Sequence, residues 1–228
     1  YEAPDSDIAA TDIASGWRKP HRNVRNFQCM WDQILSLKHL VRPHGELFEY
    51  RSIETDVLAH CMERVTRTRL AELVSQELWQ PLGAQENACF TVDSAGYSLA
   101  DGGFNATLRD YSRFGQMLCN GGVGNGKQIV PLDWIVDTLD ANPDIFHEPY
   151  NLGITNGAYR NQFWIRDVDR KVMMARGVFG QLIYIDIDNR LTITRLASWP
   201  EFLSTERKLD DYCAIDAITK HLTEVTHE

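Results

Sequence analysis

The sequence has no long apolar run and no excess of positive charge. No stretch approaches the roughly 18 apolar residues of a membrane-spanning helix, and no basic start leads into an apolar segment typical of a secretion signal. The net charge of −9 argues against nucleic acid as a partner, because phosphate binding needs a basic surface. With 228 residues, 43% of them hydrophobic, the chain can bury a sizeable core in one compact domain.

Patterned cysteines and histidines are also lacking. The cysteines are Cys29, Cys61, Cys89, Cys119 and Cys213. An odd number without C-x-x-C spacing indicates buried free thiols in a reducing compartment, which slightly favours the cytoplasm over the periplasm. His39 and His44 straddle Pro43, so they cannot share a helix face as metal ligands often do. We therefore predict no metal site and no cofactor.

Two common serine-nucleophile motifs are absent as well. There is no G-x-S-x-G, and no serine is followed by a lysine three residues later. A third motif is present in outline only: residues 121–127 fit G-x-x-x-x-G-K, the skeleton of a phosphate-binding loop. Gln128 stands where a Ser or Thr is needed to reach magnesium, and the segment follows a predicted helix instead of a strand. We interpret it as a glycine-rich turn between two helices.

The order of predicted elements indicates an α+β fold. Helices come first, short strands rich in aromatic and β-branched residues follow, and one helix closes the chain. The expected helices are Asp7–Trp17, Phe27–Leu40, one starting at Ser52, Leu70–Trp79 ending at Pro81 and Gly83, Thr107–Leu118, one starting at Pro131, and Leu209–Val225. The expected later strands are Phe163–Arg166, Val172–Ala175, Gln181–Asp186 and Leu191–Leu196, from which we predict a sheet of three or so antiparallel strands.

Tyr50-Arg51-Ser52 is the first candidate for a catalytic element. A tyrosine is a poor general base in water because its pKa is near 10. At the amino end of a helix its phenolate would be stabilised by the helix dipole, which lowers that pKa. An ordinary strand-end tyrosine and an N-cap serine explain the same residues, and spacing alone favours that simpler explanation.

The second candidate is Gly177-Val178-Phe179-Gly180-Gln181 at the start of a predicted strand. Glycines there let a ligand approach the backbone closely. The Val178 N–H could donate to an oxyanion that develops during a reaction. A tight bend without any ligand is the alternative explanation.

Taken in order, four blocks of the chain resemble the β-lactamase-related serine hydrolases, which include the class C β-lactamases and penicillin-binding proteins. The blocks are Phe48–Ser52 with Thr55–Leu58, Glu77–Ala84, Gly102–Asp110 with Arg113–Met117, and Gly177–Gln181 with Arg195–Pro200. The branch that looks most similar is that of amide and ester hydrolases related to aminohexanoate-oligomer (nylon-oligomer) hydrolase. Its Tyr-x-x-Pro-x-Ser segment matches residues 1–6, with Asp12 and Gly16-Trp17 following.

The resemblance implies an antiparallel sheet with helices on both sides and a mostly helical region beside it. Residues 1–145 would form the helical region, and residues 146–228 would form sheet strands and the closing helix of a single domain. In this family a serine attacks a carbonyl, helped by the lysine of an S-x-x-K motif, which would lie upstream of Tyr1. The missing N-terminal segment of the same protein would therefore be an essential partner, and we expect the chain alone to be inactive and unstable.

The resemblance also implies roles for individual residues. Tyr50 would act as general base and acid, Ser52 would support the proton network, and the Val178 N–H would form half of the oxyanion hole. The substrate cleft would be lined by Tyr1, Asp12, Gly177 and Phe179. Ala175-Arg176 stands where β-lactamases carry Lys-Thr, which favours small neutral amides or esters over penicillins. Two alternatives remain open: a non-catalytic binding or regulatory relative, and a DD-peptidase-like enzyme acting on cell-wall peptides.

Overall fold

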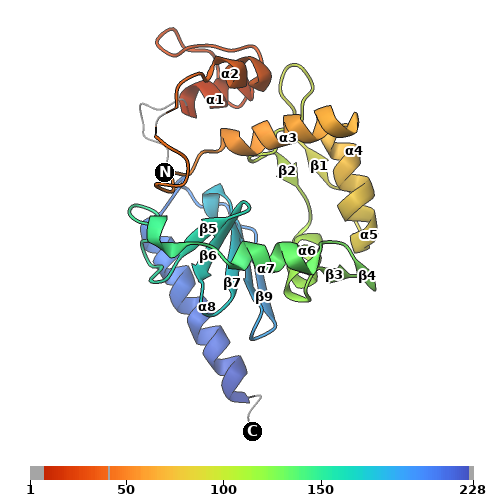
Figure 1. The fold of residues 1–228 in the computed structure, drawn as a ribbon, viewed down its shortest axis with the longest axis vertical. Coiled ribbons are helices and arrows are strands. Elements are labelled where there is room, and N and C mark those ends of the chain that lie inside the picture. Colours follow the sequence, from red (N-terminus) through yellow and green to blue (C-terminus); the bar gives the residue numbers. More distant parts are fainter. Residues whose placement is uncertain (1–7, 41, 226–228) are drawn as a thin grey trace. The chain divides into compact units, whose positions relative to one another are not determined.

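The computed structural model describes residues 8–40 and 42–225. By its contacts the chain divides into two compact units, whose helices and strands are labelled in Figure 1. Unit 1 comprises Tyr1–Leu78 and Glu86–Ala106, and unit 2 comprises Trp79–Gln85 and Thr107–Glu228. The predicted division at residue 145 of a single larger domain stays a prediction.

Unit 1 is mainly helical. Its elements are α1 (Ile8–Ala14), α2 (Met30–Ser36), α3 (Ile53–Thr66), α4 (Leu70–Val74) and a two-stranded ribbon of β1 (Cys89–Phe90) and β2 (Phe104–Asn105). The core joins α1, α2, α3 and the loop before β2 through Ala14, Met30, Ile53 and Leu99, with Phe27 and Ile34 packed against it. All the predicted helices of this region are present, and α1 and α2 are shorter than expected.

The helix that starts at Leu70 continues past its predicted stop at Pro81. A π-helical segment, Ser75–Trp79, follows α4 and leads into α5 (Gln80–Leu82). Proline has no amide hydrogen, and its ring crowds the carbonyl four residues earlier. The wider π-helical turn accommodates Pro81 without ending the helix. The helix ends at Gly83, whose φ of +71° is the left-handed conformation that glycine adopts without strain.

Unit 2 contains a five-stranded antiparallel meander, not the three or so strands predicted. The strands are β5 (Ala158–Arg160), β6 (Phe163–Asp167), β7 (Val172–Arg176), β8 (Leu182–Asp186) and β9 (Leu191–Arg195), in that spatial order. Four of them coincide with predicted segments. β5 escaped prediction because three residues are too few to establish an alternating pattern.

Helices cover both faces of this sheet (Figure 1). Ile183 of β8 faces α6 (Leu108–Cys119), where a Cβ added to Gly115 would lie 2.8 Å from the Ile183 Cγ2. The next residue, Tyr184, points to the opposite face, where the Arg166 guanidinium lies 5.9 Å from its ring and 4.7 Å from the Tyr212 ring of α8 (Thr205–Val225). The predicted α+β architecture is confirmed.

Helical spacing in the sequence predicts that the apolar stripe of α8 consists of Tyr212, Ile215, Ile218 and Leu222, and the structure differs from this prediction. Tyr212, Ile215 and Thr219 are buried, whereas Ile218 and Leu222 are 43% and 46% exposed. Each helical residue turns the chain by about 100°, so positions 212, 215 and 219 share a face and position 218 lies well away from it. Because the stripe was read from apolar residues alone, the buried threonine was missed.

The glycine-rich segment is a β-hairpin between α6 and α7 (Leu132–Leu139). Its strands are β3 (Val123–Gly124) and β4 (Lys127–Gln128), joined by Asn125 and Gly126 at φ +47° and +73°. Two positive φ values at Asn-Gly are typical of a type I′ turn. The segment opens no helix that could face a phosphate, in agreement with the turn interpretation. In the described part of the chain, no helix combines the length and apolar character needed to cross a membrane.

Candidate functional site

Tyr50 and Ser52 lie directly before α3, as predicted. Ser52 occupies the N-cap position with helical backbone angles, φ −55° and ψ −46°, and its hydroxyl makes no capping hydrogen bond. N-cap serines usually have extended angles and accept from the helix amides, so ordinary capping does not account for this serine. Tyr50 and Ser52 are both partly buried.

The segment before Tyr50 is held by an acidic residue between two arginines. The Glu49 carboxylate accepts from Arg42 at 2.5 Å and from Arg51 at 2.6 Å. All three side chains are about one-third exposed, so these pairs are each worth at most about 1 kcal/mol. Their effect is to fix the approach of the chain to α3 on both sides of Tyr50.

A buried carboxylate in the first turn of α3 was missed as a candidate. Asp56 is only 2% exposed and accepts from the Ala100 N–H at 2.8 Å. Burial raises the pKa of Asp56 to about 6, backbone hydrogen bonds from Ala100 and Asp101 oppose the rise, and the nearby Asp93 adds to it. Asp93 is 5% exposed and accepts from the Met30 N–H at 3.0 Å. The available signal was a carboxylate at position i+3 from the apolar Ile53, on the face that packs inward.

Asp12 lies in α1, and Tyr1 lies outside the described residues. The Asp12 side chain is partly buried, which raises its pKa, while Arg18 opposes the rise. The Asp12 carbonyl accepts from the N–H groups of Trp17 and Arg18 at 2.9 and 3.0 Å and closes the helix. The Trp17 ring lies against Gly102, where a Cβ would come within 3.1 Å of it. Unit 1 therefore brings the Gly16-Trp17 pair into contact with the block that starts at Gly102.

Gly177, Val178 and Phe179 lie together in the turn between β7 and β8. Residues Val178–Gly180 form a single 3-10 turn, and the Gly177 N–H donates to the Gln181 carbonyl at 3.0 Å. Phe179 has φ +55° and ψ +22°, a left-handed conformation that costs a non-glycine residue about 1–2 kcal/mol. Val178 and Phe179 are 38% and 40% exposed.

The strained turn is held by the segment that follows β9. The Phe179 N–H donates to the Phe202 carbonyl at 3.0 Å, and the Phe179 carbonyl accepts from the Trp199 N–H at 3.1 Å. The Phe179 and Phe202 rings meet edge to face, with centroids 5.6 Å apart. The Val178 N–H takes part in none of these bonds, so the turn fixes its backbone without using this amide.

Arg176, at the end of β7, is directed over the sheet. Its guanidinium lies 5.0 Å from the centre of the Trp164 ring. Burial, and to a lesser extent the charge of Arg176, lowers the pKa of Lys208 on α8 to about 8. Two cationic side chains thus lie near each other beside this strand end.

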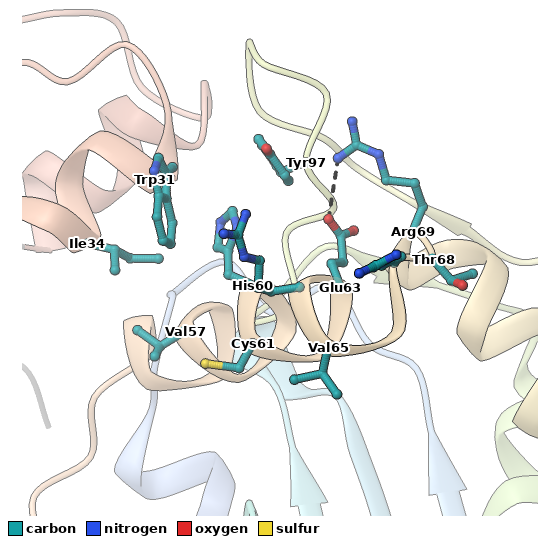
Figure 2. Close-up of a pocket in the computed structure, with 12 residues that line it drawn as sticks. Trp31, Ile34, Val57, His60, Cys61, Glu63, Val65, Thr68, Arg69 and Tyr97 are labelled. Atoms are coloured by element: carbon teal, nitrogen blue, oxygen red, sulfur yellow. Dashed lines mark hydrogen bonds and ion pairs between the residues drawn. The ribbon is translucent and has the colours of Figure 1, made fainter.

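A pocket of unit 1 lies along the second half of α3, beside an aromatic stack (Figure 2). Its volume is about 880 Å³. The His60 ring lies between Trp31 and Tyr97, at 4.9 and 4.6 Å between centroids, and the Arg69 guanidinium covers Tyr97 at 4.6 Å. Burial lowers the pKa of His60, although Glu63 opposes this effect. None of the predicted site residues that the structure describes lines this pocket.

Cysteines and metal ligands add no further site. All five cysteines are free thiols; Cys29 and Cys119 are buried, whereas Cys61, Cys89 and Cys213 are exposed, contrary to the expectation that all are buried. Within residues 8–40 and 42–225, no three His, Cys, Asp or Glu side chains are grouped so that they could hold a metal ion.

Comparisons with known proteins identify relatives. The beta-lactamase family matches residues 15–215. A 6-aminohexanoate-dimer hydrolase from Paenarthrobacter ureafaciens is 31% identical over 207 residues, which are 88% of this chain and 51% of that protein. A solved structure from Bacillus anthracis, assigned as a 6-aminohexanoate-dimer hydrolase, has a TM-score of 0.84 at 30% identity and covers 98% of this chain and 57% of that one.

A more distant solved structure shares the fold alone. It is a Bacteroides dorei protein assigned as a beta-lactamase, with a TM-score of 0.61 at 18% identity over 91% of this chain and 70% of that one. The chain spans about half the length of the two relatives with higher identity. The family match extends over most of the chain and includes Tyr50, Val178 and the strands between β5 and β9. The chain therefore belongs to the beta-lactamase family, as its four sequence blocks predicted.

Proposed function

We propose that the complete protein is a serine hydrolase that cleaves amide or ester bonds through an acyl-enzyme. The observation that carries the proposal is the 31% identity to a 6-aminohexanoate-dimer hydrolase over 88% of this chain, and the family match over residues 15–215 spans the tyrosine before α3 and the β7–β8 turn. The nucleophilic serine and its lysine would come from an S-x-x-K motif in a segment that precedes Tyr1.

The chemistry assigned to this chain is proton transfer and charge stabilisation. The serine Oγ forms a bond to the substrate carbonyl carbon while its proton passes to the Tyr50 phenolate. The amino end of α3 stabilises that phenolate through the helix dipole. Tyr50 then gives the proton to the departing amine or alcohol, and water releases the acyl group by the reverse sequence.

The Val178 N–H would donate to the carbonyl oxygen as it becomes negatively charged. The rigid turn supports this role, because a donor that is already oriented needs no reorganisation during the reaction. Ser52 would support proton transfer at Tyr50, two residues before it in the segment that leads into α3.

The substrate class follows from two features of unit 2. Ala175 occupies the place of the β-lactamase lysine that helps hold the carboxylate of a penicillin. Phe179 presents a 40% exposed apolar ring next to Val178. Both favour linear amides and esters over penicillins, in keeping with the substrate named for the Paenarthrobacter relative.

The test is a Tyr50→Phe variant of the full-length protein, assayed with nitrophenyl esters and short linear amides. Loss of the proton relay is expected to lower kcat by about 10²- to 10⁴-fold. Tyr159→Phe is the matched control, because the Tyr159 hydroxyl bonds Gln162 on the surface of β5. Unchanged turnover by a folded Tyr50→Phe protein would contradict the assignment. Residues 1–228 alone, without a nucleophile, are expected to show no turnover.

The same preparation distinguishes the other functions. A non-catalytic relative would show no covalent mass increase with a fluorophosphonate, which labels reactive serines. A cell-wall enzyme would release alanine from D-Ala-D-Ala peptides faster than it cleaves linear esters.

A further inference from the structure

The turn that carries Val178 is held in place by a set of side chains to which no role has been assigned. The carbonyl of Gly180 accepts from the Arg195 Nε at 2.9 Å. Arg195 belongs to β9, and its other two guanidinium nitrogens both bond the Asp211 carboxylate, one of them at 2.6 Å. The Arg195 side chain therefore connects the turn that carries Val178 to α8.

Stacking fixes the plane of the same guanidinium. The Arg195 group lies 5.0 Å from the centre of the Trp199 ring. That ring lies against Gly180, where an added Cβ would come within 2.5 Å of it. Arg195 is thus held by a bidentate ion pair on one side and an aromatic face on the other, and both constraints converge on Gly180, two residues from Val178.

A second contact closes the other end of the turn. The Gln181 side-chain amide donates to the Ala197 carbonyl at 2.6 Å and accepts from the Ala197 N–H at 3.1 Å. Between these contacts Phe179 keeps its positive φ. A strained conformation persists only where surrounding contacts fix it, so the direction of the adjacent Val178 N–H depends on them.

We propose that Arg195, paired with Asp211, is a positioning residue that sets the orientation of the Val178 N–H for the oxyanion. The inference rests on the proposed function, since it assumes that this amide stabilises a developing negative charge. Arg195 contacts no reacting atom in this scheme. It acts through the Gly180 carbonyl.

The experiment compares Arg195→Lys with wild type in the full-length protein. Lysine keeps the positive charge but cannot bond Gly180 and both oxygens of Asp211 while it stacks on Trp199. We expect kcat/KM for p-nitrophenyl acetate to fall about 10- to 100-fold, because small misplacements of a catalytic group have effects of this size. The Ki of phenylboronic acid, whose serine adduct places an oxygen where the oxyanion forms, should rise by a similar factor.

Arg160→Lys is the matched control. Arg160 lies in β5 and forms an ion pair with Asp137, and both side chains are more than 40% exposed. This variant should change neither constant. A purely structural role of Arg195 would lower the fraction of active protein, and so kcat, while leaving KM and the boronate Ki unchanged. That result would overturn the inference.

Asp211→Asn serves as the second variant, because it breaks the same pair with a side chain of similar size. It should reproduce the rise in boronate Ki and should speed hydrogen exchange of the Phe179 amide. Active wild-type protein with unchanged Ki in both folded variants would overturn this inference alone. Wild-type protein with no esterase activity and no boronate inhibition would overturn the proposed function and this inference with it.

Discussion

Replacing Asp56 by asparagine should make the protein more stable at neutral pH. Burial raises the pKa of this carboxyl from 3.8 to about 6, so the folded protein holds a proton that the unfolded chain has released. Stability from this group is therefore fully present below pH 3.8 and is lost as the pH rises through 6. At about 1.4 kcal/mol for each tenfold change in proton affinity, the penalty at pH 8 is about 3 kcal/mol.

Asparagine carries no charge and can still accept the bond from Ala100. Urea unfolding of the full-length protein at pH 4 and pH 8 measures the effect. The unfolded carboxyl is already partly ionised at pH 4, so relative to wild type Asp56→Asn should gain about 2.4 kcal/mol more at pH 8 than at pH 4. Asp32→Asn, on the exposed face of α2, is the control. Its unfolding free energy should differ from that of wild type by the same amount at pH 4 and at pH 8. An equal loss of stability by Asp56→Asn at pH 4 and pH 8 would refute the reasoning.

Two glycine substitutions test the packing of unit 2. Gly115→Ala places a Cβ 2.6 Å from the Thr192 Cγ2, so it should push α6 from the sheet and lower the unfolding free energy by about 1–3 kcal/mol in urea titrations. Gly180→Ala adds both a strained φ of +88° and a clash with Trp199, and it should abolish esterase activity. Gly126→Ala, at φ +73° with no neighbour within 4 Å, carries the strain alone. Equal losses of stability for Gly180→Ala and Gly126→Ala would show that the Trp199 contact is unimportant.

The sequence predicted the elements better than the contacts between them. Strands β6 to β9 were found because aromatic and β-branched residues gather in short runs between turn residues. The order of the blocks identified the family without any catalytic serine. The strand-forming runs and the sequence blocks can both be recognised in the chain itself, without knowledge of its tertiary contacts.

What could not be predicted depends on tertiary contacts. A phenylalanine at positive φ goes against its own preference, and only the bonds to Trp199 and Phe202 explain Phe179. Likewise, an aspartate in the first turn of a helix normally indicates an exposed charge near the helix dipole. The burial of Asp56 becomes evident only once the loop bearing Ala100 is placed beside it.

The pair of hydrogen bonds between Gln181 and Ala197 restricts which residue can occupy position 181. Backbone pairing between β8 and β9 ends at Leu182 and Arg195, and one step beyond it a side-chain amide takes the place of a peptide group. Only glutamine combines this reach with a donor and an acceptor, because asparagine is one methylene shorter and glutamate has no N–H to give. One side chain therefore extends the pairing of β8 and β9 by one step, toward the turn that carries Val178.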